Sequence, residues 1–165
     1  MSQTPAELTV APARENDVPL VLEFIRKLAE YERLSADVIA DESMLRESLF
    51  GAKPAAEVVL AYWANEPVGF AVYFQSFSTF IGRPGIYLED LFVLPGFRGK
   101  GIGKALLRHL ARIAKTRNCA RLEWAVLDWN QPAIKFYRSL GAIPLQDWTV
   151  FRLTDSALHE LAEQN

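Results

Sequence analysis

Three glycines at alternate positions mark a short turn between an apolar strand and an amphipathic helix. The turn spans residues 98–103 and reads R-G-K-G-I-G, after the strand pattern of residues 86–93 and before the helical pattern of residues 102–116. Glycine leaves backbone N–H groups uncovered, and the first N–H groups of a helix have no partner inside that helix. The positive end of the helix dipole lies behind them. The turn therefore predicts a site for an anion such as a pyrophosphate, and a simple tight turn stays open as the alternative.

Two common phosphate-binding patterns do not fit this turn. A Walker A loop, G-x-x-x-x-G-K-[ST], would need a glycine at Arg98 and a hydroxyl at Ala105. A dinucleotide-binding loop, G-x-G-x-x-G, would need its third glycine at Lys104. The pattern that remains is R-x-x-G-x-G/A, which follows an apolar strand.

Composition limits the classes of protein that fit. The chain has 165 residues, half of them hydrophobic, and a net charge of −2, so we expect one packed domain and no nucleic-acid partner. Residues 1–8 lack the layout of a signal peptide, and the longest apolar run, residues 58–64, is too short to cross a bilayer. We therefore expect a soluble cytoplasmic protein without a membrane partner.

Three residues that often carry chemistry have simpler interpretations here. Cys119 is the only cysteine, which rules out a disulfide within the chain and favours a reducing compartment, and we expect a buried structural thiol. His109 and His159 form no ligand cluster, so we expect both on the solvated surface and no metal site.

Hydrophobic periodicity and turn residues predict the element order β-α-α-β-β-β-α-β-α-β-α. The expected strands cover residues 9–10, 58–63, 68–77, 86–93, 121–127 and 148–153. One expected helix covers residues 102–116. The other expected helices begin after the capping residues Asn16 or Asp17, Asp41, Asn130 and Thr154. An antiparallel meander followed by a β-α-β crossover predicts an α/β (α+β) fold. We expect a single domain, residues 1–165, with a mixed, mostly antiparallel central sheet and helices on both faces.

Two carboxylates lie inside the apolar strand of residues 86–93. Glu89 and Asp90 should point to opposite faces of the sheet, because side chains alternate along a strand, unless a bulge intervenes. Burial of an unpaired carboxylate is costly, so each is paired, neutralised or functional. A salt bridge to an arginine or lysine is one interpretation, and binding or deprotonation of an amine is the other.

A second motif lies in residues 130–141, N-x-x-A-x-x-F-Y-x-x-x-G, after the strand of residues 121–127. Core packing explains Phe136, and helix capping alone could explain Asn130. Because this motif follows R-x-x-G-x-G in the chain, however, the pair of motifs resembles the pair found in the GNAT N-acetyltransferase superfamily. Residues 28–32 (L-A-E-Y-E), 81–83 (I-G-R) and 87–90 (Y-L-E-D) are similar to its diamine acetyltransferase branch, whose best-known members acetylate spermidine and spermine.

This resemblance implies a GNAT fold in which two parallel strands, residues 86–93 and 121–127, splay apart to hold the pantetheine of acetyl-CoA. Amides of the turn would bind the pyrophosphate, and the Arg98 side chain would add charge. The residues implied for the coenzyme are Leu91, Phe92, Val93, Arg98, Gly99, Lys100, Gly101, Ile102, Gly103, Lys104, Asn130 and Tyr137. The family also implies a homodimer whose partner subunit helps to form the substrate channel.

The resemblance implies an acetyl-CoA-dependent N-acetyltransferase. In such an enzyme the primary amine of a small cationic substrate would attack the thioester of acetyl-CoA directly. An alkylammonium with a pKa of about 10.4 must lose a proton before it attacks. Glu89 would be the base, Tyr137 would protonate the leaving thiolate, and Tyr31, Glu32, Glu89 and Asp90 would line the amine site. The alternatives are a protein or peptide N-acetyltransferase of the same fold and a non-catalytic acyl-CoA sensor.

Two departures from the polyamine enzymes bear on the substrate. Residues 78–80 read S-T-F where those enzymes carry Asp-Pro-Trp, and residues 83–86 are one residue longer. The missing acid contributes to holding a distal ammonium group. We therefore expect a shorter diamine, a basic amino acid or a lysine analogue rather than a long polyamine.

Overall fold

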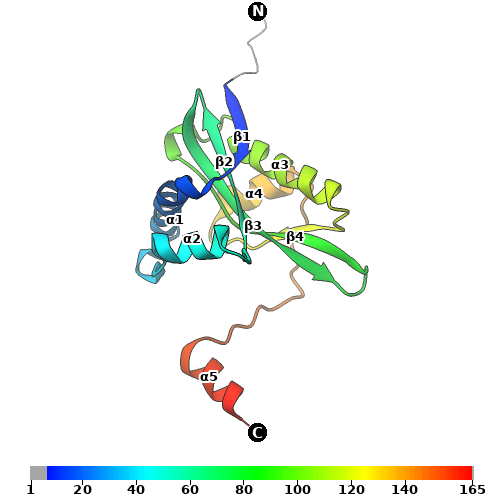
Figure 1. The fold of residues 1–165 in the computed structure, drawn as a ribbon. Coiled ribbons are helices and arrows are strands. Elements are labelled where there is room, and N and C mark those ends of the chain that lie inside the picture. Colours follow the sequence, from blue (N-terminus) through cyan, green and yellow to red (C-terminus); the bar gives the residue numbers. More distant parts are fainter. Residues whose placement is uncertain (1–6, 165) are drawn as a thin grey trace, which may run out of the picture. The chain divides into compact units, whose positions relative to one another are not determined.

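The computed structural model describes residues 7–164 (Figure 1). An open sheet with helices packed on it lies within residues 8–127. The strands are β1 Leu8–Pro12, β2 Glu57–Trp63, β3 Glu66–Ser78, β4 Arg83–Val93 and β5 Leu122–Trp124. The α-helices are α1 Val18–Glu32, α2 Glu42–Phe50, α3 Ile102–Thr116, α4 Gln131–Ser139 and α5 Asp155–Glu163. Short 3-10 turns cover Glu15–Asp17, Ser35–Asp37 and Pro95–Phe97.

The sheet has the order β1-β2-β3-β4-β5. Each strand from β1 to β4 pairs antiparallel with the next, and β4 pairs in parallel with β5. A parallel pair needs a crossover, and α3 supplies it. The predicted mixed, mostly antiparallel sheet is therefore confirmed.

Helices cover both faces of this sheet (Figure 1). On one face, Phe24 of α1 packs against Phe70 of β3, with ring centroids 5.5 Å apart, and the same core includes Leu49 of α2. On the other face lies α3, whose Leu106 and Leu110 are fully buried. Apolar residues three and four apart on α1 and α3 produce these buried stripes.

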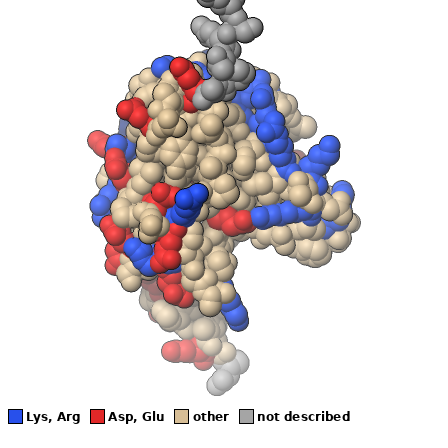
Figure 2. Space-filling view, turned by 45° about the horizontal axis from the view of Figure 1, so that its top comes forward, with Lys and Arg blue, Asp and Glu red and all other residues tan. Residues whose placement is uncertain are grey.

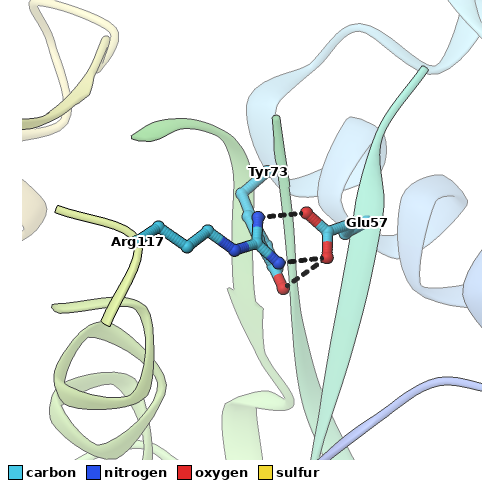
Figure 3. A network of polar contacts seen from close by, with 3 residues as sticks. All are labelled: Glu57, Tyr73 and Arg117. Atoms are coloured by element: carbon cyan, nitrogen blue, oxygen red, sulfur yellow. Dashed lines mark hydrogen bonds and ion pairs between the residues drawn. The ribbon is translucent and has the colours of Figure 1, made fainter. Parts of the chain in front are cut away.

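A polar network ties the end of α3 to the sheet (Figure 3). Arg117, which caps α3, donates from Nη1 to Glu57 Oε2 at 2.6 Å and from Nη2 to Glu57 Oε1 at 2.7 Å. The Tyr73 hydroxyl donates to Glu57 Oε1 at 3.4 Å. The bond from Arg117 lowers the pKa of Glu57, whereas burial and then the charge of Glu57 raise the pKa of Tyr73 to about 12. The network connects α3, β2 and β3.

The chain divides into two compact units, Met1–Leu127 and Asp128–Asn165. The first contains the sheet and α1 to α3, and the second contains α4 and α5. Within the second unit, Asn130 caps α4, because its Oδ1 accepts a hydrogen bond from the amide of Ala133 at 3.3 Å. Among the described helices, none is both long enough and apolar enough to span a membrane.

Several sequence expectations are corrected by the structure. The strand expected at residues 148–153 does not form, and its residues are exposed, because a strand needs a neighbour to complete its hydrogen bonds and this segment has none in the described chain. β5 is shorter than the expected 121–127. Cys119 was expected to be buried and His109 to be solvated, but both are half-buried. Burial, followed by the charge of Arg112, lowers the pKa of His109.

Candidate functional site

The glycine turn after β4 presents unpaired amide donors. Gly99 and Gly101 have φ values of 77° and 81°, the left-handed region that favours glycine, and a Cβ at either position would meet no atom within 4 Å. The first backbone bond of α3 runs from the Ala105 amide to the Gly101 carbonyl at 2.9 Å. Between residues 7 and 164, no backbone acceptor takes a bond from the amides of residues 99–104. The donor set fits a diphosphate.

Arg98 connects the start of this turn with the end of α1. Its Nε donates to the Val93 carbonyl at 3.0 Å. Its guanidinium carbon lies 4.6 Å from the ring centroid of Tyr31 and 5.6 Å from that of Phe92, within cation–π range. The side chain thus lies against the strand and the Tyr31 ring, and the role of its charge at a pyrophosphate stays a prediction.

A β-bulge in β4 positions the two carboxylates. Leu88 pairs with Tyr73 and Asp90 pairs with Val72, so Glu89 is an extra residue without a partner on β3. The extra residue shifts the alternation. Asp90 therefore shares a face with Val72, in the core beneath α1, whereas Leu88 shares the opposite face with Tyr73. Glu89 is exposed and Asp90 is half-buried.

Two acidic side chains, Glu89 and Glu32, act on Asp90 at this point. Burial, then the charge of Glu89 and then that of Glu32 raise the pKa of Asp90 to about 6. Burial raises the pKa of Glu32, at the end of α1 beside Tyr31. A cation beside these carboxylates would relieve the repulsion at Asp90.

The structure argues against one of the two interpretations of these acids. Within the described part of the chain, the ion pairs involve other carboxylates, namely those of Glu15, Glu23, Glu57 and Glu123. Glu32, Glu89 and Asp90 have no lysine or arginine counter-ion there, which argues against a structural salt bridge, and the binding of an amine stays a prediction. Figure 2 shows one face of the molecule, on which basic side chains form a row along the right flank and acidic side chains lie mostly on the left, with basic side chains among them.

The remaining predicted residues belong to the second unit. Tyr137 lies on α4, half-buried, with its ring centroid 5.4 Å from that of Phe136. Asn130 is buried at the α4 cap. The structure brings together the turn, Glu89, Asp90, Glu32 and Tyr31 in the first unit, and the placement of Tyr137 and Asn130 at this site stays a prediction.

Sequence reasoning missed two aromatic residues beside the turn. The Nζ atom of Lys100 lies 5.1 Å from the Trp63 ring centroid and 5.1 Å from the Phe97 ring centroid. Phe97 lies directly before the turn in sequence, so its contact with Lys100 was predictable. Trp63 is the last residue of β2, and no sequence pattern connects it with Lys100.

Comparison with known proteins identifies the family. The model of the acetyltransferase (GNAT) family matches residues 22–142. The chain belongs to this family. Thialysine N-epsilon-acetyltransferase of Bos taurus is 39% identical to it over 168 residues, which are 95% of this chain and 98% of the bovine protein. Human spermidine/spermine N(1)-acetyltransferase-like protein 1 is 32% identical over 161 residues, which are 91% of this chain and 23% of the human protein.

A solved structure is also similar to this chain over most of its length. An integron cassette protein from the mobile metagenome of V. cholerae matches with a TM-score of 0.80 and 31% identity, covering 96% of this chain and 99% of that protein. The predicted GNAT fold and the resemblance to diamine-type acetyltransferases are confirmed, and the chain is an N-acetyltransferase.

Proposed function

We propose that this enzyme transfers an acetyl group from acetyl-CoA to a primary amine of a small cationic substrate. The observation that carries the proposal is the acidic cluster of Glu32, Glu89 and Asp90, which lacks a basic counter-ion in residues 7–164 and lies next to a turn of unpaired amides. Arg98 links the two halves of the site through Tyr31. One half suits an anionic donor and the other a cationic acceptor.

Acetyl-CoA would supply a thioester carbonyl that an amine can attack. The amides of residues 98–104 would hold its pyrophosphate, with Asn130 and the backbone of residues 91–93 holding the rest. The Val93 carbonyl accepts one bond from Arg98 Nε, and a carbonyl oxygen has a second lone pair for a pantetheine amide. No group of His, Cys, Asp and Glu able to hold a metal occurs among the residues that the structure describes.

The acidic cluster would prepare the amine for reaction. Its negative charge attracts the ammonium form, and the bulged Glu89, exposed at the edge of the cluster, accepts the proton directly or through water. Tyr137 would donate a proton to the leaving thiolate, since a phenol with a pKa of about 10 suits a thiolate with a pKa of about 8.5.

Two variants test these roles. Tyr137→Phe should lower kcat, by about 100-fold if general acid catalysis has its usual weight, and leave acetyl-CoA affinity near the wild-type value. Glu89→Gln should remove the acidic limb of the pH–rate profile. Full kcat in Tyr137→Phe, or an unchanged pH profile in Glu89→Gln, would contradict the respective role.

Thialysine and related basic amino acids are the favoured substrates. The segment of residues 78–80 lacks the acid that would hold a distal ammonium group, and Phe80 is fully exposed. The likeness to enzymes named for thialysine supports the same class. The substrate class is tested by measuring coenzyme A release with thialysine, lysine, ornithine, putrescine, spermidine and a lysine peptide. Turnover of the peptide alone would favour a protein N-acetyltransferase. Binding of acetyl-CoA without turnover of any amine would favour a sensor.

We further propose that both units form one acetyltransferase domain, residues 1–165, that acts as a cytoplasmic homodimer. The family match continues across the boundary after Leu127. In the second unit, Ile143, Trp148 and Phe151 are 82%, 76% and 92% exposed, as expected of side chains that a second subunit covers. Light scattering coupled to gel filtration should give about twice the 18.6 kDa chain mass, and a monomer would refute the dimer.

A further inference from the structure

Lys100 lies at the tip of the glycine turn, yet its side chain contacts two aromatic rings. The 5.1 Å distances to the Trp63 and Phe97 ring centroids are both within the range of about 6 Å for a cation–π contact. Trp63 is the last residue of β2, and Phe97 ends the 3-10 turn before the loop. Lys100 therefore joins the tip of the turn to a strand distant in sequence.

The turn has few other contacts that fix its conformation. Gly99 and Gly101 have open space where a Cβ would stand, and amides 99–104 have no backbone acceptor in the portion of the chain with described coordinates. Glycine also gives a turn greater conformational freedom than other residues. Arg98 fixes the start of the turn through Val93, and α3 fixes its end. The Lys100 side chain is placed to restrain the middle.

We propose that Lys100 is a positioning residue for the coenzyme, holding the turn through the rings of Trp63 and Phe97 so that its amides are ordered before the pyrophosphate arrives. Binding to a pre-ordered turn costs less conformational entropy. This inference rests on the proposed use of acetyl-CoA. The competing role is a direct one, in which the Lys100 ammonium leaves the rings and contacts phosphate.

The two roles differ in what Trp63 should do. The experiment compares Lys100→Met, Lys100→Arg, Trp63→Leu and the Lys100→Met/Trp63→Leu double variant, with Lys53→Met as a matched control at an exposed lysine in the loop before β2. KM and kcat for acetyl-CoA are measured at saturating amine, and binding of coenzyme A by calorimetry. Thermal melts verify folding.

Positioning predicts that Lys100→Met and Trp63→Leu each raise KM for acetyl-CoA about threefold to tenfold, with kcat retained. The double variant should be no worse than Lys100→Met, because Lys100→Met already removes both ring contacts and leaves Trp63→Leu nothing further to break. Lys100→Arg should stay near wild type, since a guanidinium also stacks on aromatic rings. Lys53→Met should have no effect.

A wild-type KM in Trp63→Leu beside a raised KM in Lys100→Met would overturn the inference in favour of direct phosphate contact, and so would additive effects in the double variant. Should Trp63→Leu fail to fold, Phe97→Leu and Trp63→Phe replace it, with KM raised in the first and near wild type in the second. Failure of the proposed function would look different: the wild-type protein itself would neither bind nor turn over acetyl-CoA.

Discussion

The variant Asp90→Asn keeps the size of the side chain and removes its charge. In the folded protein, burial and the neighbouring charges of Glu89 and Glu32 raise the pKa of Asp90 from 3.8 to about 6. The unfolded chain has neither effect, so folding disfavours the ionised carboxylate. We therefore expect Asp90→Asn to be more stable than the wild type at neutral pH, although most single substitutions destabilise a protein.

The magnitude follows from the two pKa values. Each pH unit between them corresponds to about 1.36 kcal/mol, so the gap from 3.8 to about 6 gives an upper bound of about 3 kcal/mol at pH 7. Asp90 is only half-buried, and solvent screening lowers this to an expected gain of about 1–2 kcal/mol. For a chain of this size, that gain raises Tm by about 2–8 °C.

The sign of the pH dependence is fixed. Between about pH 4 and pH 6 the folded protein binds more protons at Asp90 than the unfolded chain does, so the contribution of Asp90 to stability falls as pH rises. Below the unfolded pKa both states are neutral at this position. Thermal melts should therefore show a large Tm difference between variant and wild type at about pH 7.5 and a small one at about pH 4.5.

The control is Asp37→Asn, which changes an exposed carboxylate on the short turn of residues 35–37 and should leave Tm unchanged at both pH values. Asp90→Asn should also raise the KM for the amine, because it removes one of three negative charges. A lower Tm at neutral pH, or an equal gain at both pH values, would mean that a partner stabilises the Asp90 charge, and the reasoning would be wrong.

Two further predictions concern stability elsewhere. Glu57→Gln breaks the bidentate pair with Arg117 and should lower the free energy of unfolding by about 0.5–1 kcal/mol in denaturant titrations. Because the pair lowers the pKa of Glu57, the full loss should be seen above about pH 4.5. A loss of the same size in more acidic solution would contradict this reasoning. Gly101→Ala should cost about 1–2 kcal/mol, since alanine disfavours a φ of 81°, whereas Gly96→Ala should cost almost nothing, and equal costs would refute the conformational argument.

The elements with strong local signals were predictable from the sequence. The predicted bounds of α3, residues 102–116, match the structure, because its apolar stripe is regular and the glycine turn marks its start. The turn itself was predictable for the same reason. Residues 148–153 have an equally good strand pattern, but strand formation depends on an available neighbour, which local sequence does not specify.

The arrangement of the site depended on contacts between distant segments. The sequence placed Glu89 and Asp90 in one strand, but the bulge depends on the pairing of β4 with β3. The R-x-x-G pattern indicated a role for Arg98 at the turn, but the direction of its side chain depends on Tyr31, which α1 supplies. The charge of Glu32 acts on Asp90, which local sequence did not reveal, and the placement of Glu32 near the amine stays a prediction.

The bulge also separates two contributions of Glu89, its carboxylate and its extra backbone unit. Deletion of Glu89 would make Leu88 and Asp90 consecutive, opposite the consecutive partners Tyr73 and Val72, so every other pair of the ladder could be kept. Each side chain would also stay on its present face, because alternation would then place Leu88 and Asp90 on opposite sides.

We therefore expect the Glu89 deletion to fold with a regular β4 ladder, whereas Glu89→Ala keeps the bulge and removes only the carboxylate. Loss of the base lowers kcat in both variants. The deletion should lose more, because closing the ladder removes the local twist that the extra residue gives the strand at the acidic cluster. Circular dichroism and thermal melts report folding, and kcat with thialysine reports activity. Equal kcat values in two folded variants would show that the carboxylate alone matters, and an unfolded deletion variant would show that β4 cannot keep its pairing without the bulge.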